Sequence, residues 1–120
     1  MARRDITGAV DFAYLEGYAA GDQALVDEVL ALFREQAALW APLLDIGAEG
    51  WADAVHTLKG AGRGVGAHAL GAACEFAEAA DLDPALRAVR LAAVRDALEL
   101  ALADIAAYAH ERALQDLRAP

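Results

Sequence analysis

Apolar residues recur every three to four positions through most of this 120-residue chain, which is the spacing of one face of an α-helix. The stripes are separated by residues that end or begin helices, among them Gly21, Gly66 and the pair Asp83-Pro84. Alanine and leucine fill 33 and 17 positions, whereas valine, isoleucine and threonine together fill 12. Strong helix formers therefore dominate, and we predict an all-α fold.

The stripes and their boundaries predict five helices. Their expected ranges are 11–20, from the N-cap Asp22 to near Pro42, from Ala48 or Glu49 to Gly66, 67–80, and 84 to about 114. The inward stripe begins at Leu25 in the second helix and at Leu86 in the last. Short connections favour antiparallel neighbours, so we expect an up-down-up-down four-helix bundle with a short extra N-terminal helix. The bundle domain should span residues 11–118, with residues 1–10 loosely ordered.

The charge balance excludes several classes of function. The net charge is −9 and the isoelectric point is near 4.6, which argues against binding to duplex nucleic acid or to an anionic membrane surface. No uncharged apolar run reaches the length of a membrane span. A single cysteine, Cys74, excludes an internal disulfide and a multi-cysteine zinc site. We expect a cytoplasmic, monomeric protein in which Cys74 is a buried apolar residue.

The third helix carries the informative polar residues. Measured from the centre of its apolar stripe, at about 100° per residue, His56 lies at about 160°, nearly opposite the core. Arg63, Ala52 and Lys59, the only lysine in the chain, flank it. Gly60 follows one turn later, where it removes side-chain bulk beside the imidazole at a cost of about 1 kcal/mol relative to alanine. His56 should therefore face water, although the glycines leave residues 60–66 open to a loop conformation.

These residues form part of a longer pattern. The run 56–62, HTLKGAG, is followed by Gly66, Leu70, Cys74 and Glu78. This pattern resembles the histidine-containing phosphotransfer (HPt) domain. Members of that family are four-helix bundles that relay phosphoryl groups between histidine kinases and the receiver domains of response regulators.

The resemblance implies a role for each matching residue. His56 corresponds to the phosphoaccepting histidine, and Lys59 to the cation that stabilises the phosphoryl group. Gly60 corresponds to the small residue that gives the receiver room to dock. Glu78 corresponds to the acid or amide that orients the imidazole, holding Nδ1 so that Nε2 is the free nucleophile.

The resemblance also implies a mechanism and its partners. The chain would be a phosphoryl carrier of a two-component phosphorelay, not an autonomous ATP-dependent kinase. It would bind no cofactor of its own, and Mg²⁺ would belong to the partner receiver. Lys59 and Arg63 should give a local positive patch that attracts the acidic partner. The residues expected to contact the docked partner are Gly60, Ala52, Arg63, Phe12 and Leu15.

Other interpretations remain beside this one. The chain could be an HPt-fold interaction module that binds and inhibits a kinase or receiver without being phosphorylated. A metal-binding bundle is a third possibility, but the paired Glu-x-x-His motifs of di-iron bundles are absent. The glycines of residues 60–66 do not fit GxxxxGK[ST], which disfavours a phosphate-binding loop. His68 and His110 are interpreted as structural or solvated.

Overall fold

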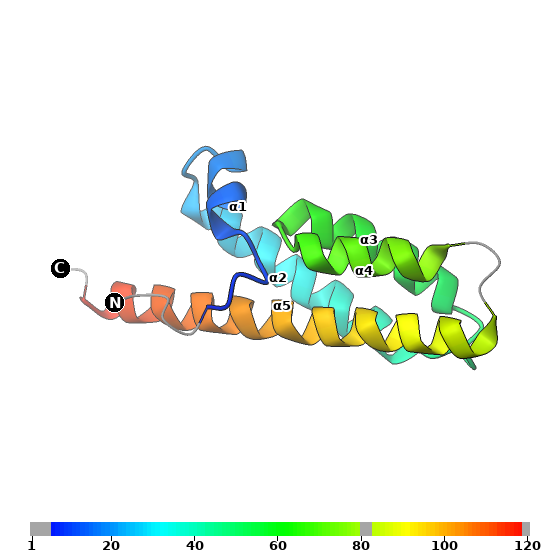
Figure 1. Ribbon diagram of the computed structural model, residues 1–120. Coiled ribbons are helices and arrows are strands. Elements are labelled where there is room, and N and C mark those ends of the chain that lie inside the picture. The colour runs from blue at the N-terminus through cyan, green and yellow to red at the C-terminus, as the bar shows by residue number, and fades with distance from the viewer. Residues whose placement is uncertain (1–5, 80–82, 119–120) are drawn as a thin grey trace.

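The computed structural model describes residues 6–79 and 83–118, and these ranges form helices and connections without a strand (Figure 1). The predicted all-α fold is confirmed. The helices are α1 (Phe12–Tyr18), α2 (Gln23–Trp40), the short 3-10 helix η1 (Ala41–Leu43), α3 (Trp51–Val65), α4 (His68–Glu78) and α5 (Pro84–Arg118).

The long helices alternate in direction along the bundle. Figure 1 shows α2 antiparallel to α3, α3 to α4, and α4 to α5, while α1 lies beside the start of α2. Helix α3 packs against both α2 and α4, and α5 packs against both α4 and α2. Helix α5 has 35 residues and runs most of the length of a molecule that measures 57 × 23 × 20 Å. The predicted bundle with an extra N-terminal helix is therefore confirmed.

Short-range signals set most helix ends. Asp11, Asp22 and Asp83 each accept a hydrogen bond from the backbone N–H three residues further on, at 2.8–3.1 Å, and so cap α1, α2 and α5. Gly66 ends α3 in the left-handed region with φ of 86°. A Cβ at Gly66 would also lie 2.7 Å from the carbonyl oxygen of Asp11, so both space and backbone conformation require glycine there.

Several predicted boundaries shift. Helix α3 begins at Trp51 instead of Ala48 or Glu49, because residues 45–48 form a turn closed by a 2.9 Å bond from Ala48 N to Asp45 O. Helix α2 ends at Trp40, and Pro42 lies in η1. Helix α5 continues to Arg118 rather than ending near residue 114. The segment 60–65, which could have been a loop, is helical.

Helix α4 is shorter than the predicted range 67–80, whose last residue lies outside the described ranges. The helix ends at Glu78, and Ala79 is extended. Two arginines of α5 donate to carbonyls at this end: Arg87 to the oxygen of Ala79 at 3.2 Å and Arg90 to that of Phe76 at 2.8 Å. These bonds satisfy carbonyls that the end of the helix leaves without a partner.

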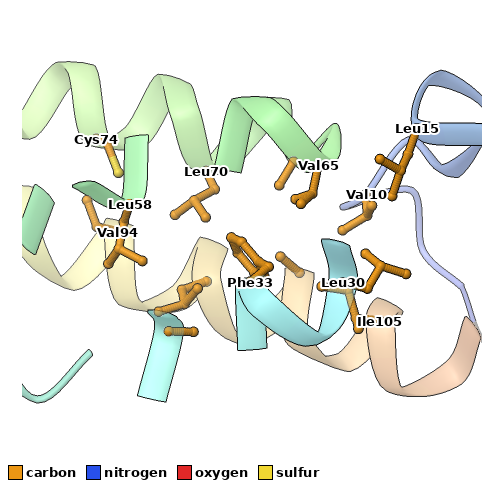
Figure 2. Close-up of a cluster of buried hydrophobic side chains, with 14 of the residues drawn as sticks. Val10, Leu15, Leu30, Phe33, Leu58, Val65, Leu70, Cys74, Val94 and Ile105 are labelled. Carbon is orange, nitrogen blue, oxygen red and sulfur yellow. The ribbon is translucent and has the colours of Figure 1, made fainter. Parts of the chain in front are cut away.

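The core lies between the four bundle helices and is closed at one end by α1. Figure 2 shows apolar side chains from these elements pointing toward one another. Its labelled members are Val10, Leu15, Leu30, Phe33, Leu58, Val65, Leu70, Cys74, Val94 and Ile105. Leu25 and Leu86 were expected to face inward but are 41% and 39% exposed. Both lie in the first turn of a helix.

The N-terminal segment is attached to α5 by a buried carboxylate. Asp104 has no exposed surface and accepts hydrogen bonds from the backbone N–H groups of Thr7, Gly8 and Val10 at 2.8–3.1 Å. The Thr7 hydroxyl donates a fourth, at 2.9 Å. The loose attachment expected for residues 1–10 is thus wrong for residues 7–10, and residues 1–5 lie outside the described ranges. This anchor fixes the entry to α1.

Candidate functional site

The antiparallel pair α3 and α4 brings three of the predicted site residues together. Glu78, at the end of α4, lies between His56 and Lys59 of α3. Its Oε2 is 3.2 Å from the Nδ1 of His56, and its Oε1 is 2.5 Å from the Nζ of Lys59. His56 and Lys59 are three residues apart and so share one side of α3. One carboxylate therefore contacts both the imidazole and the ammonium.

The three side chains differ in exposure. The His56 side chain is 75% exposed, as its position opposite the apolar stripe predicts. Those of Lys59 on α3 and Glu78 on α4 are only 22% and 25% exposed. The imidazole thus projects into solvent from a largely covered ion pair.

The environment of Glu78 favours its charged form. Burial by itself would raise the pKa of Glu78, but the hydrogen bonds and charges of Lys59 and His56 lower it further than burial raises it. The net result is a pKa below the ordinary glutamate value. An ionised carboxylate accepts hydrogen bonds only, so it favours the His56 tautomer whose proton is on Nδ1.

The glycines of α3 divide into two kinds. A Cβ at Gly62 would lie 2.9 Å from Leu70 Cδ2, so packing against α4 requires that glycine. A Cβ at Gly60 or at Gly64 would meet nothing within 4 Å. The fold itself therefore does not explain Gly60 or Gly64, and a requirement for space outside the chain would. Gly64 was not among the predicted site residues. The sequence alone does not show that Gly62 is required for packing against α4 whereas Gly64 is not.

The prediction that a docked partner contacts Phe12 and Leu15 is wrong. Phe12 and Leu15 are 4% and 2% exposed, so a partner on the surface cannot reach them. Helix α1 turns this apolar face onto the core, where the Phe12 ring stacks on Tyr108 at 4.2 Å between centroids. The exposed aromatic side chains of α1 are Tyr14 and Tyr18.

The other predicted docking residues lie on the outer side of α3. Ala52 and Gly60 are exposed, one turn before and one turn after His56. Arg63 is half exposed, and its Nη2 lies 3.0 Å from Glu75 Oε2. Because Lys59 and Arg63 each pair with a glutamate of α4, the predicted positive patch is wrong. Two ion pairs occupy this face instead.

Cys74 lies within electrostatic reach of the site but is buried, as predicted. Burial and, secondarily, the negative charge of Glu78 raise its pKa to about 11. The thiol is therefore neutral near pH 7 and is not a competing nucleophile.

A metal site and a membrane-spanning helix each have structural requirements that the described residues do not meet. Within residues 6–79 and 83–118, no group of three or more histidine, cysteine, aspartate or glutamate side chains is arranged to hold a metal ion. Over the same ranges, no helix combines the length and apolar character needed to cross a membrane.

The chain is similar to a solved protein. The crystal structure of the histidine phosphotransferase ShpA from Caulobacter crescentus superposes with a TM-score of 0.82 and is 66% identical in sequence. The match covers 92% of this chain and 99% of that one. No protein-family model and no curated protein sequence matches the chain. With this identity over nearly the whole length, the chain belongs to the histidine phosphotransferase (HPt) family and acts in a phosphorelay.

Proposed function

We propose that His56 carries the phosphoryl group, which it accepts at Nε2 from a phosphorylated receiver aspartate or a kinase and delivers to another receiver. The main observation in favour is the contact between His56 Nδ1 and Glu78 Oε2, 3.2 Å apart, on a side chain that is otherwise exposed. With Nδ1–H donating to the carboxylate, the lone pair on Nε2 is left for attack.

The chemical step uses this arrangement directly. As the N–P bond forms, the P–O bond to the aspartate carboxylate breaks, and the carboxylate leaves with that electron pair. The imidazole gains positive charge as Nε2 donates its electrons. The Glu78 carboxylate, already hydrogen-bonded to Nδ1–H, offsets this charge without reorganising. Transfer to the next receiver reverses the same bonds.

Lys59 supports the step in two ways under this proposal. Its ammonium holds the second oxygen of Glu78 at 2.5 Å, so that the first faces His56. An ammonium has three N–H donors, and the remaining ones can bind an oxygen of the phosphoryl group on a neighbouring side chain. The negative charge of phosphohistidine would draw Lys59 partly away from Glu78.

HPt proteins act with kinase and receiver partners, and we propose that the receiver docks over the outer side of α3. Ala52 and Gly60 offer the clearance beside His56 that a large partner needs. Next to Gly60 along α3, helices α2 and α3 line an open apolar groove of about 210 Å³. Its lining residues are Val29, Leu32, Phe33, Gln36, Ala61, Gly64 and Val65. An apolar groove that continues the nucleophile's face suits the buried centre of a protein interface.

The proposal is tested by transfer of an acid-labile phosphoryl label from a panel of phosphorylated receivers and kinases to the purified chain. His56→Gln should receive no label while melting like the wild type. His68→Gln and His110→Gln are matched controls on exposed histidines and should be labelled normally. Label on His56→Gln would overturn the assignment. Binding of a receiver without label on any form would favour the non-phosphorylated interaction module.

A further inference from the structure

Arg63 is seated in a slot that a glycine of the neighbouring helix provides. A Cβ at Gly71 would lie 2.9 Å from Arg63 Cγ and 3.1 Å from its Nε. The stem of Arg63 therefore crosses the backbone of α4 at the one position without a side chain. Beyond Gly71, the guanidinium donates to Glu75 at 3.0 Å. Arg63 thus has a defined direction, unlike an arginine that extends into solvent.

The absence of a side chain at Gly71 allows Arg63 to lie across α4. A glycine inside a helix is less favourable than alanine, and Gly71 has no positive φ that would require it. The three atoms nearest to its missing Cβ all belong to Arg63. An arginine that only extended into solvent would not require a glycine on the neighbouring helix.

The position of Arg63 places it inside any receiver interface. It follows His56 by seven residues, which is two helical turns, so both lie on one line along α3 about 10 Å apart. A standard protein interface covers about 800 Å² on each partner, equivalent to a disc of about 16 Å radius. A receiver centred on His56 therefore covers Arg63.

The ion pair of Arg63 can be exchanged for one with the partner. The side chains of Arg63 and Glu75 are 49% and 68% exposed, and exposed pairs contribute little to stability. A guanidinium has five N–H donors in a fixed fork, suited to a second carboxylate. Because Gly71 already fixes the stem, little further conformational entropy is lost when a partner binds.

We propose that Arg63, seated on Gly71, selects among receivers by pairing with a carboxylate about 10 Å from the partner's phosphorylated aspartate. A receiver with a lysine or arginine at that place is disfavoured by like-charge repulsion. This inference rests on the proposed role of His56.

The first test uses Arg63→Ala with the receiver that labels the wild type fastest. The receiver concentration at half-maximal rate should rise about fivefold, with the maximal rate unchanged and a weaker dependence on salt. Arg63→Lys should recover part of the loss. Arg34→Ala removes the same charge from α2, on its side toward α5, and should behave like the wild type. Equal effects of Arg63→Ala and Arg34→Ala would overturn the proposal, because global charge would then explain both.

The second test concerns the seat. Gly71→Ala displaces Arg63 and should weaken the receiver interaction as much as Arg63→Ala, without lowering the maximal rate. The double variant should be no worse than either single one. Losses that multiply would show that Gly71 acts independently of Arg63. Should Gly71→Ala fold poorly, Arg63→Ala alone decides the role of the cation. Wild-type behaviour of Arg63→Ala, with no label on His56→Gln, would overturn this inference and leave the proposed function standing.

Discussion

The Oε2 of Glu78 lies 3.2 Å from the Nδ1 of His56, joining two residues that are 22 positions apart on adjacent antiparallel helices. The chain thereby holds one ring nitrogen and presents the other to solvent. The carboxylate remains charged because Lys59 and His56 lower its pKa against the effect of burial. A positioned, exposed imidazole is the main contribution that we assign to this protein in the phosphorelay.

Replacing Glu78 by glutamine should slow phosphotransfer. The amide is nearly the same size but carries no charge to offset the imidazolium, and losing about 1.4 kcal/mol of transition-state stabilisation slows the step about tenfold. Single-turnover transfer from a phosphorylated receiver measures the effect. Glu99→Gln, at an exposed position of α5, is the control for a lost surface charge. Equal rates for wild type and Glu78→Gln would show that the charge of Glu78 does not contribute, because the amide oxygen can still accept the hydrogen bond from Nδ1–H.

Replacing Lys59 by alanine should both slow transfer and shorten the lifetime of phosphohistidine. Loss of one charge-assisted hydrogen bond to the phosphoryl group costs about tenfold in rate. Lys59→Arg keeps the charge, so its transfer rate and phosphohistidine lifetime should lie between those of the wild type and those of Lys59→Ala. The decay of labelled protein after the donor is removed gives the lifetime. If Lys59→Ala has the same transfer rate and the same phosphohistidine lifetime as the wild type, Lys59 has no role in phosphotransfer.

Substitutions of the two unexplained glycines should separate stability from function. Gly60→Ala and Gly64→Ala should each stabilise α3 by about 1 kcal/mol, because neither methyl meets a neighbour. A larger side chain, as in Gly60→Leu, should nevertheless block receiver docking. Thermal melting and transfer rates are compared, with Gly62→Ala as a control that should destabilise by forcing Leu70 to move. Normal transfer by Gly60→Leu would show that clearance is not limiting.

The stability of the fold should depend on the ionisation of Asp104. Burial alone would raise its pKa, but hydrogen bonds from Thr7, Val10 and Gly8 outweigh it and hold the pKa below the ordinary value. A depressed carboxyl pKa means stability that is present above the unfolded value, about 4, and is lost as the pH falls through the folded pKa. Asp104→Asn should therefore cost about 2–3 kcal/mol near pH 7.

Denaturant unfolding at several pH values tests this linkage. The difference in the free energy of unfolding between the wild type and Asp104→Asn should become smaller as the pH falls below about 4. Asp96→Asn, on an exposed side of the same helix, is the matched control and should show no such difference. If this difference did not change with pH, the negative charge of Asp104 would not be what stabilises the attachment of residues 7–10.

Local patterns were enough for the fold and for the outward direction of His56. Asp11, Asp22 and Asp83 mark helix starts because a cap bonds only to the next turn. The outward direction of His56 follows from helical phase alone. Burial of Phe12 and Leu15 could not be told from exposure for docking, because a short amphipathic helix offers one apolar stripe to either use.

Long-range relationships account for the rest. Asp104 is bonded to residues 94 to 97 positions earlier, so no short-range pattern distinguishes it from an ordinary surface aspartate. The pairing of Lys59 and Arg63 with α4 glutamates depends on the register of two helices. For the same reason, Gly71 can be linked to Arg63 only once the helices are packed together.

The position of the phosphoryl group on the imidazole tests the central claim most directly. Heteronuclear ³¹P and ¹⁵N spectroscopy of the phosphorylated chain distinguishes a phosphorus bonded to Nε2 from one bonded to Nδ1. We predict phosphorylation of His56 at Nε2, with Nδ1 still protonated toward Glu78. Phosphorus on Nδ1 of His56, or on any other residue, would contradict the account.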